Sequence, residues 1–276
     1  MKTFKEKFYD FVVTDFDGTI FNSRGEVSQT TVKTIKRFIA NGGTFCVCTG
    51  RMTGSIIPFL KRFGLDDGFV ISYNGAEISN VKTGEKIYKQ HVDTVNAVKM
   101  LQYAEKNGYD LMVYPDDVIT VEHVNELNAD YVRLNGTECR VLGAKVSEYF
   151  QKHQLTTGKA LFLTGGNAEV SLKIRDELPQ IVTGLNITRS NPYHVDVMKA
   201  GVSKGETVKE FAKLMGKSLE RLVCFGDEMN DASMMEVCAL SAVPVSGSPI
   251  LKERCDLIID ACDDDGVSKA MQKYCI

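Results

Sequence analysis

The sequence lacks the residue patterns of several protein classes. Its eight cysteines contain no C-x-x-C pair, and no second His or Cys lies at metal-ligand spacing from His194, so neither a disulfide framework nor a His/Cys metal site is expected. No apolar run approaches the roughly 20 residues of a membrane span, and Met1 to Asp10 lacks the apolar core of a signal peptide. We therefore expect a cytoplasmic protein without a membrane partner, in which Cys46, Cys48 and Cys224 are small buried hydrophobes.

Charge and nucleotide-binding motifs exclude further classes. The formal net charge is −3, and the basic residues are dispersed rather than clustered, so nucleic acid is not an expected partner. Neither G-x-x-x-x-G-K-[ST] nor G-x-G-x-x-G occurs, which excludes the enzymes that hold nucleotides with these loops. With 276 residues, 43% of them hydrophobic and 25% of them charged, the chain has an ordinary globular composition and room for two domains.

Apolar runs and helical patterns alternate through most of the chain, which is typical of βαβ units. Short apolar runs that stop at turns predict buried strands of a parallel sheet. One helix is expected to begin at Ser28 and to end at Asn41, and another is expected to run through Leu60. The predicted strands are Phe11–Val13, Thr44–Cys48, Phe69–Ser72, Leu222–Phe225 and Leu257–Ile259.

The middle of the chain is more amphipathic, and its connections are more polar. We interpret this region as a separate α/β unit inserted into the core sheet, which divides the chain into residues 1–83, 84–191 and 192–276. The elements expected in the insert are helices at Thr94–Lys106 and Ala168–Leu178 and strands at Tyr109–Tyr114, Val118–Val121, Lys159–Thr164 and Asn186–Arg189.

Two carboxylates directly follow the first predicted strand. In an extended segment, residues i and i+2 project to the same side, so Asp15 and Asp17 would crowd together unless the turn rotates one away or a cation lies between them. Ligands of open α/β sheets collect at the carboxyl ends of the strands. Another acidic group, Asp227 with Asn230 and Asp231, follows a later strand. This placement indicates a hard-cation site together with an acid/base pair.

Two further residues lie where an anion would bind. Thr49 follows a strand and precedes a glycine, at the kind of turn that offers backbone N–H groups to an anion. Ser203 and Glu206 match a capping box, which places Lys204 in the first turn of a helix, where the macrodipole disfavours a cation by roughly 0.3–1 kcal/mol. A bound phosphate would resolve this conflict, because both the lysine and the helix N-terminus attract it. Broken local rules of this kind are common at functional sites.

Each of these features is common on its own. An isolated D-x-D is more often a turn than a site, a lone lysine is usually solvated, and acids at Asp227 and Glu228 could simply begin a helix. Their co-occurrence at strand and helix boundaries makes chance a poor explanation. Together they supply acids for a cation, and a threonine and a lysine for an anion. This inventory suffices for phosphoryl transfer, because Mg²⁺ would remove the repulsion between a carboxylate nucleophile and a phosphate dianion.

The motifs occur in a specific order along the chain. D-x-D-G-T at Asp15, T-G-R at Thr49, G-V-S-K-G around Lys204 and G-D-x-x-N-D at Gly226 together resemble the haloacid dehalogenase (HAD) superfamily of phosphohydrolases. The insert, between Asn74-Gly75-Ala76 and the lysine motif, resembles that of the Cof-type branch with its type IIB α/β cap. The resemblance covers essentially the whole chain and implies a doubly wound, mostly parallel, Rossmann-like α/β core with an inserted α/β cap domain.

The resemblance also implies roles for individual residues. Asp15 would be the nucleophile that forms an aspartyl-phosphate, and Asp17 would act first as general acid and then as general base. Mg²⁺ would be held by Asp15, the backbone carbonyl of Asp17 and Asp227. Asn230 and Asp231 would support that shell or orient the lysine. The residues implied in binding the phosphoryl group or the substrate are Asp15, Gly18, Thr49, Gly50, Arg51, Asn74 and Lys204.

One loop departs from the family pattern. Similar proteins usually carry a G-N-A-like turn after the last acidic motif, with its Asn facing the site, but this chain has Ser246-Gly247-Ser248-Pro249. The shorter side chain of Ser248 reaches less far, so the substrate contacts of this loop stay open. The sequence does not rank the cap residues that could contact the leaving group. These candidates are Tyr114, Asp116, His123, Arg133, Arg140, Lys159 and Asn167.

The leading hypothesis is a cytosolic Mg²⁺-dependent phosphatase of small phosphorylated metabolites. Sugar phosphates are the default class, and phosphorylated cofactors such as flavin or pyridoxal phosphates are an alternative. A cap would exclude bulk water and polymeric substrates. A phosphomutase with the same intermediate stays open, as does a non-catalytic module that binds a phosphorylated ligand. A phosphoacceptor signalling domain is disfavoured, because such receivers are single small domains. We expect a monomer or a small homo-oligomer.

Overall fold

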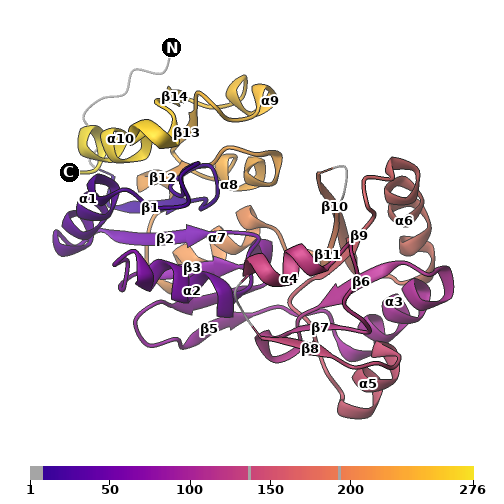
Figure 1. The fold of residues 1–276 in the computed structure, drawn as a ribbon. Coiled ribbons are helices and arrows are strands. Elements are labelled where there is room, and N and C mark those ends of the chain that lie inside the picture. Colours follow the sequence, from indigo (N-terminus) through magenta and orange to yellow (C-terminus); the bar gives the residue numbers. More distant parts are fainter. Residues whose placement is uncertain (1–8, 136–137, 192–193) are drawn as a thin grey trace. The chain divides into compact units, whose positions relative to one another are not determined.

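The computed structural model describes residues 9–135, 138–191 and 194–276, so the expectation about Met1 to Asp10 lies mostly outside the described residues. The chain divides into two compact units (Figure 1). The first, here called the core unit, comprises the residues up to Arg51 together with Ile56–Ile87 and Ser203–Ile276. The second, here called the cap unit, comprises Met52–Ser55 and Tyr88–Val202.

The core unit is built on a mostly parallel sheet, as the sequence predicted. Its strands lie in the order β14-β13-β12-β1-β2-β3-β4-β5. All pairs from β14 to β3 are parallel, and β4 pairs with β3 in the antiparallel direction. The strand order reverses at β1, which makes the carboxyl ends of β1 and β12 a topological switch point. The strands are β1 (Phe11–Thr14), β2 (Thr44–Cys48), β3 (Phe69–Ser72), β4 (Glu77–Asn80), β5 (Lys86–Lys89), β12 (Leu222–Phe225), β13 (Leu240–Pro244) and β14 (Leu257–Ile259).

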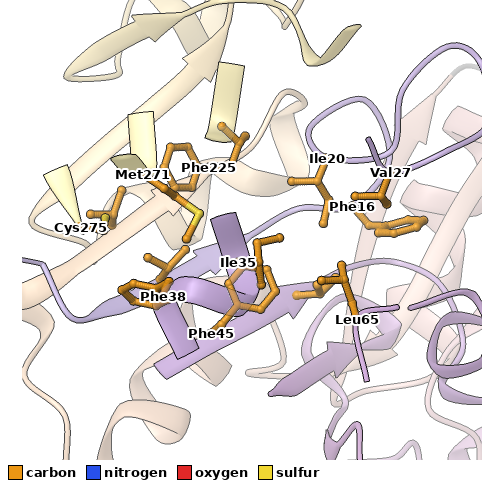
Figure 2. Close-up of a cluster of buried hydrophobic side chains, with 14 of the residues drawn as sticks. Phe16, Ile20, Val27, Ile35, Phe38, Phe45, Leu65, Phe225, Met271 and Cys275 are labelled. Atoms are coloured by element: carbon orange, nitrogen blue, oxygen red, sulfur yellow. The ribbon is translucent and has the colours of Figure 1, made fainter. Parts of the chain in front are cut away.

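Helices cover both faces of the core sheet. On one face, α1, α2 and α10 enclose a cluster to which Phe38 and Met271 contribute (Figure 2). On the other face, the ring of Phe211 in α7 lies 5.6 Å from that of Phe11 in β1. Because alternate residues of a strand face opposite sides, burial of both faces explains why these strands read as continuous apolar runs. The helices are α1 (Gln29–Ala40), α2 (Thr53–Arg62), α7 (Lys204–Leu214), α8 (Ala232–Met235), α9 (Pro249–Lys252) and α10 (Gly266–Tyr274).

The cap unit is a second, mainly antiparallel α/β layer. Its strands lie in the order β10-β11-β9-β6-β7-β8. Helices α3, α5 and α6 pack on one face of this sheet, where Met100, Phe150 and Ile174 meet Phe162 and Val197. The elements are α3 (Thr94–Asn107), β6 (Asp110–Val113), β7 (Ile119–Val121), α4 (Ala129–Asn135), β8 (Cys139–Val141), α5 (Val146–His153), β9 (Ala160–Leu163), α6 (Ala168–Ile181), β10 (Leu185–Asn191) and β11 (His194–Lys199).

The compact units divide at different residues from the predicted insert, which ran over 84–191. The cap unit instead extends to Val202, because β11 pairs with both β9 and β10 and thereby completes the cap sheet. A segment that the sequence assigned to the core therefore belongs to the cap.

Two expectations about composition can be compared with the structure. All eight cysteines are free, and Cys46, Cys48 and Cys224 are buried, as the prediction of small buried hydrophobes requires. Among the helices formed by the described residues, none is long and apolar enough to cross a membrane.

Candidate active site

The first carboxylate of the site extends the pairing of two parallel strands. Asp15 directly follows β1, and its N–H donates to the carbonyl of Phe225, the last residue of β12, at 2.8 Å. This bond joins the carboxyl ends of β1 and β12 at the switch point, where ligands of open α/β sheets bind. Asp15 is only 7% exposed, so its carboxylate needs partners inside the protein.

A buried lysine is the main partner of this carboxylate. Lys204 is 1% exposed, and its Nζ donates to Oδ1 of Asp15 and to Oδ1 of Asp231, each at 2.6 Å. The lysine begins α7 directly after the N-cap Ser203, whose hydroxyl accepts the N–H of Glu206. The predicted capping box is only half formed, because the Glu206 carboxylate accepts from the lysine one turn further on. Lys204 thus connects the carboxylates that follow β1 and β12.

The acidic residues after β12 are held by backbone and hydroxyl donors. Asp231 is fully buried, and its Oδ2 accepts the N–H groups of Asp227 and Glu228, both at 3.0 Å. The Thr19 hydroxyl donates to Oδ1 of Asp227 at 2.9 Å. Gly18, with a φ of +76°, lies so close that a Cβ there would clash with the Asp227 carboxylate. The D-G-T sequence therefore brings the loop after β1 against the loop after β12.

The cluster carries more negative than positive charge. Burial raises the pKa of Asp15 well above its ordinary value, an effect that Lys204 opposes and Asp231 increases. Burial also raises the pKa of Asp227 to about 6, although the bond from Thr19 acts against this. Burial by itself would lower the pKa of Lys204, but the neighbouring Asp15 and Asp231 outweigh that effect and raise it. The lysine is therefore charged, and another cation would stabilise the ionised carboxylates.

The donor set fits a hard divalent cation. One oxygen from each of Asp15, Asp227 and Asp231 lies within 4.8 Å of the other two, and carboxylate oxygens are the ligands that Mg²⁺ prefers. Asp231 already uses its two oxygens for Lys204 and for backbone N–H groups. Asp15 and Asp227 make fewer hydrogen bonds to protein and are the better placed of the three to accept a cation.

The loop after β2 contributes the predicted threonine and glycine. Thr49 is buried, and its hydroxyl accepts the N–H of Arg51 at 3.2 Å, while its carbonyl accepts the N–H of Asn74 at 3.0 Å. A Cβ at Gly50 would come within 3.0 Å of Oδ1 of Asn74, so glycine lets this amide lie close to the loop. The side-chain amide of Asn230 donates to the same oxygen at 3.4 Å. Two of the predicted motifs, T-G-R and G-D-x-x-N-D, thus meet at Asn74.

A turn with unusual backbone angles places this asparagine after β3. Tyr73 and Asn74 have φ angles of 54° and 55°, a region that costs residues other than glycine about 1–3 kcal/mol each. The N–H of Tyr73 donates to the carbonyl of Arg51 at 2.9 Å, and the hydroxyl of Thr207 in α7 donates to the carbonyl of Gly75 at 2.7 Å. These bonds hold the turn against the carboxyl end of β2 and the start of α7.

The second carboxylate of the D-x-D motif lies apart from the cluster. The side chain of Asp17 is 50% exposed, and its two oxygens accept from Nε and Nη2 of Arg51 at 2.8 and 2.6 Å. The turn has therefore rotated one acid away from the other, which is one of the two outcomes that crowding of Asp15 and Asp17 predicted. Arg51, which the resemblance associates with substrate binding, is bound to the acid here.

The loop that departs from the family pattern contacts the acidic loop through its backbone. The N–H of Ser248 donates to the carbonyl of Asp227 at 2.8 Å. A Cβ at Gly247 would lie 3.1 Å from that same carbonyl, so the two loops pack closely. The backbone of Ser248 thus supports the acidic loop.

The sequence analysis assigned no role to some residues that contact the site. Thr19 binds Asp227, and its place in D-x-D-G-T is the signal that could have identified it. Phe16, Phe21 and Phe59 surround the guanidinium of Arg51, and no local pattern marks them because they come from a loop and from a separate helix.

The seven cap residues left unranked by the sequence lie in different surroundings within the cap unit. Lys159 is buried and donates to Asp196 at 3.0 Å. Tyr114 is also buried. Asn167 is the N-cap of α6 and accepts the N–H groups of Glu169 and Val170. Of the others, Asp116, His123 and Arg133 are exposed, and Arg140 is half-buried.

The comparison with a known family extends over almost the whole chain. The profile of the haloacid dehalogenase-like hydrolases matches residues 12–271. The chain belongs to this family. The resemblance to Cof-type HAD phosphatases with a type IIB cap is confirmed, as is the doubly wound α/β core.

Two relatives of this HAD hydrolase align with it along nearly their full lengths. A Streptococcus pyogenes protein, named for an expected phosphatase activity, is 25% identical over 268 residues, covering 95% of this chain and 97% of its own. The pyridoxal phosphate phosphatase YbhA of Escherichia coli is 22% identical over 277 residues, covering 96% and 98%. The HAD hydrolase is accordingly an enzyme of the phosphatase class.

Solved structures agree with the fold. The structure of TM0651 from Thermotoga maritima has a TM-score of 0.85 at 25% identity, over 97% of this chain and 98% of that one. The HAD subclass IIB sugar phosphatase BT4131 has a TM-score of 0.78 at 22% identity, over 96% and 98%. Both similarities extend over core and cap elements alike.

Proposed function

We propose that this HAD enzyme is a Mg²⁺-dependent phosphatase of small phosphorylated metabolites that acts through an aspartyl-phosphate on Asp15. The observation that carries the proposal is the double contact of Lys204 with Asp15 and Asp231, inside a cluster of three carboxylates. A lysine buried beside a carboxylate at a strand end can hold a phosphoryl oxygen directly next to a nucleophile.

In the first half of the reaction, Asp15 attacks phosphorus through a carboxylate oxygen. The bond between phosphorus and the leaving oxygen breaks, and Asp17 gives a proton to that oxygen. Lys204 and Thr49 bind the oxygens of the transferred group, where charge is spread in the transition state. The exposed position of Asp17 suits this role, because the leaving group lies on the side of phosphorus opposite the buried nucleophile.

In the second half, Asp17 takes a proton from water as the water oxygen bonds to phosphorus. The bond between phosphorus and Asp15 then breaks, and inorganic phosphate leaves. Asn230 and Asp231 orient other residues of the site. Asp231 accepts a hydrogen bond from Lys204, and Asn230 donates one to Asn74. Gly18 and Gly50 let neighbouring side chains approach the loops that bind the phosphate.

Enzymes of this family generally use Mg²⁺, and the residues here fit it. Asp15, Asp227 and the backbone carbonyl of Asp17 would hold the ion. When bound, it would offset the repulsion between the Asp15 carboxylate and a phosphate dianion.

Sugar phosphates are the first substrate class to test, and phosphorylated cofactors are the second. One structural neighbour is named as a sugar phosphatase, and one relative is named as a pyridoxal phosphate phosphatase. These activities are those of the two named proteins, and here they only decide which substrate class is assayed first.

The test is phosphate release from a panel of both substrate classes, with Mg²⁺ and with chelator, beside Asp15→Asn. We expect Mg²⁺-dependent release that the near-isosteric variant reduces by at least about 10³-fold, or ~4 kcal/mol. Thermal unfolding of the variant should match that of the wild type. Release by Asp15→Asn well above background would refute the nucleophile assignment. An isomeric sugar phosphate formed without free phosphate would instead indicate a mutase.

A further inference from the structure

The guanidinium of Arg51 grips the acid Asp17 at two points. Nε donates to one carboxylate oxygen at 2.8 Å, and Nη2 donates to the other at 2.6 Å. A two-point contact between planar groups fixes both the position and the plane of the carboxylate. Although the Asp17 side chain is half exposed, that of Arg51 is only 21% exposed, so the arginine is the anchored member of the pair.

Aromatic rings provide that anchorage. The Arg51 guanidinium carbon lies 5.1 Å from the ring centroid of Phe16, 5.4 Å from that of Phe21 and 4.9 Å from that of Phe59. The first two rings are stacked with centroids 4.9 Å apart, and Phe59 meets Phe21 edge-on at 6.1 Å. A guanidinium over the face of an aromatic ring is attracted by the negative charge density of that face. The three rings, here called the phenylalanine cage, therefore restrict where the guanidinium can lie.

The cage and the acid are parts of the same loop. Phe16 and Phe21 flank Asp17 in sequence, and the carbonyl of Phe16 accepts the N–H of Phe21 at 2.8 Å. The N–H of Gly18 donates to the carbonyl of Phe21 at 3.0 Å. The backbone that carries the acid thus also carries two of the rings that hold its partner.

We propose that Arg51 is a positioning residue for the acid Asp17, fixed by the phenylalanine cage, and that it does not bind the transferred phosphoryl group. The inference rests on the proposed function, because it assigns Asp17 the proton transfers. It gives Arg51 a different duty from the substrate binding that the T-G-R motif implied.

The chemistry of both groups agrees with this assignment. Each carboxylate oxygen has two lone-pair sites, so a carboxylate gripped by one arginine keeps a free site on each oxygen for a proton. Arginine presents its donors in a rigid planar fork, whereas lysine offers a single charged point on a flexible stem. A lysine at this position would keep the charge but lose the orientation.

The experiment compares two substrates that share a phosphoryl group and differ in the leaving group. p-Nitrophenyl phosphate leaves as a stable phenolate and needs little help from an acid, whereas an alkyl phosphate such as glucose 6-phosphate needs a proton. The quantity measured is kcat/KM, which reports transfer of the phosphoryl group to the enzyme. For Arg51→Gln we expect at least about a tenfold fall with the alkyl phosphate, which is part of the 10²–10⁴ that an acid contributes. With p-nitrophenyl phosphate we expect less than about a threefold change.

Three variants separate positioning from other roles. Arg51→Lys should resemble Arg51→Gln, since charge without the fork does not restore orientation. Phe59→Leu, which opens the cage, should show the same preference for p-nitrophenyl phosphate with a smaller fall. In an Asp17→Asn background, Arg51→Gln should cost nothing further, because a residue that acts through another has no effect once that one is removed.

The outcomes are distinguishable. Equal falls with both substrates, or full rescue by Arg51→Lys, would mean that Arg51 binds the phosphoryl group and would overturn the inference. An additive loss in the double variant would overturn it as well. If the wild type releases phosphate from neither substrate, the proposed function fails, and this inference fails with it. Thermal unfolding of each variant identifies losses that come from misfolding.

Discussion

Among the residues that the structure describes, each unit buries one lysine, and these two lysines have different surroundings. In the core, Lys204 bridges Asp15 and Asp231 with Asp227 close by. In the cap, Lys159 pairs with Asp196 at 3.0 Å, and its Nζ lies 5.7 Å from the ring centroid of Tyr114. Both lysines are at most 4% exposed. The core cluster thus has three carboxylates for one lysine, whereas the cap has a balanced pair.

The difference in charge balance indicates a difference in purpose. A balanced buried pair can be replaced by apolar residues with little cost, because desolvation offsets its attraction. A buried cluster with excess negative charge is costly unless something else neutralises it. Burial raises the pKa of Asp15 well above its ordinary value, and the neighbouring Asp231 adds to this effect. The core cluster is therefore the one expected to bind a cation, and a costly charge arrangement of this kind is typical of a functional site.

Of the changes that test this comparison, removal of the core lysine, Lys204, should have the largest effect on activity. We expect Lys204→Met to lower kcat/KM by about 10²–10³-fold, the loss typical of one buried donor to a developing oxyanion. The matched control is Lys209→Met on the same helix, where the lysine is exposed and pairs with Glu206. That pair is worth at most about 0.5 kcal/mol. Unchanged kinetics in Lys204→Met would reduce this lysine to a structural residue.

Removing the cap lysine, Lys159, should affect stability rather than catalysis. Lys159→Met leaves Asp196 buried and unbalanced, so we expect the free energy of unfolding to fall by about 3–5 kcal/mol. Adding Asp196→Leu should recover most of this loss, because the second change removes the stranded charge. Denaturant unfolding of the single and double variants measures both effects. A double variant no more stable than Lys159→Met would show that the pair is not a replaceable structural element.

Added Mg²⁺ should stabilise the core unit and leave the cap unit unchanged. At a concentration of 100 times its Kd, the ion should stabilise the unit that binds it by about 2.7 kcal/mol. We expect the added protection from hydrogen exchange to appear in peptides of β1, β12 and α7, and not in those of β6 or β9. Asp227→Asn should abolish it. Equal protection of both units would contradict a site confined to the core cluster.

Local sequence patterns predicted the elements that position the site. β1, β2 and β12 are buried on both faces, so they read as plain apolar runs. β13 was not predicted, because it contains Ser241, whose N–H and hydroxyl are satisfied by the distant Asp256. A polar residue buried by a partner from another segment has no local signature.

Long-range pairs set the limit of sequence prediction. The motifs brought Asp15, Lys204 and Asp227 together as acids for a cation and a lysine for an anion, because the ends of adjacent strands meet at one edge of a sheet. They could not predict that Asp17 pairs with Arg51, 34 residues away, since that depends on how one turn rotates.

The smallest expected effect concerns the helix caps that lead into each unit. Ser203 caps α7 and Asp93 caps α3, each by accepting one backbone N–H in the first turn of its helix. Replacing either residue by alanine should cost about 1 kcal/mol of stability. Only Ser203→Ala should also lower kcat, by a few-fold, because the next residue is Lys204 and its Nζ must reach Asp15. Steady-state kinetics at a temperature where both variants are fully folded measure this. Equal kcat values for the two variants would mean that the lysine is held by its carboxylates alone.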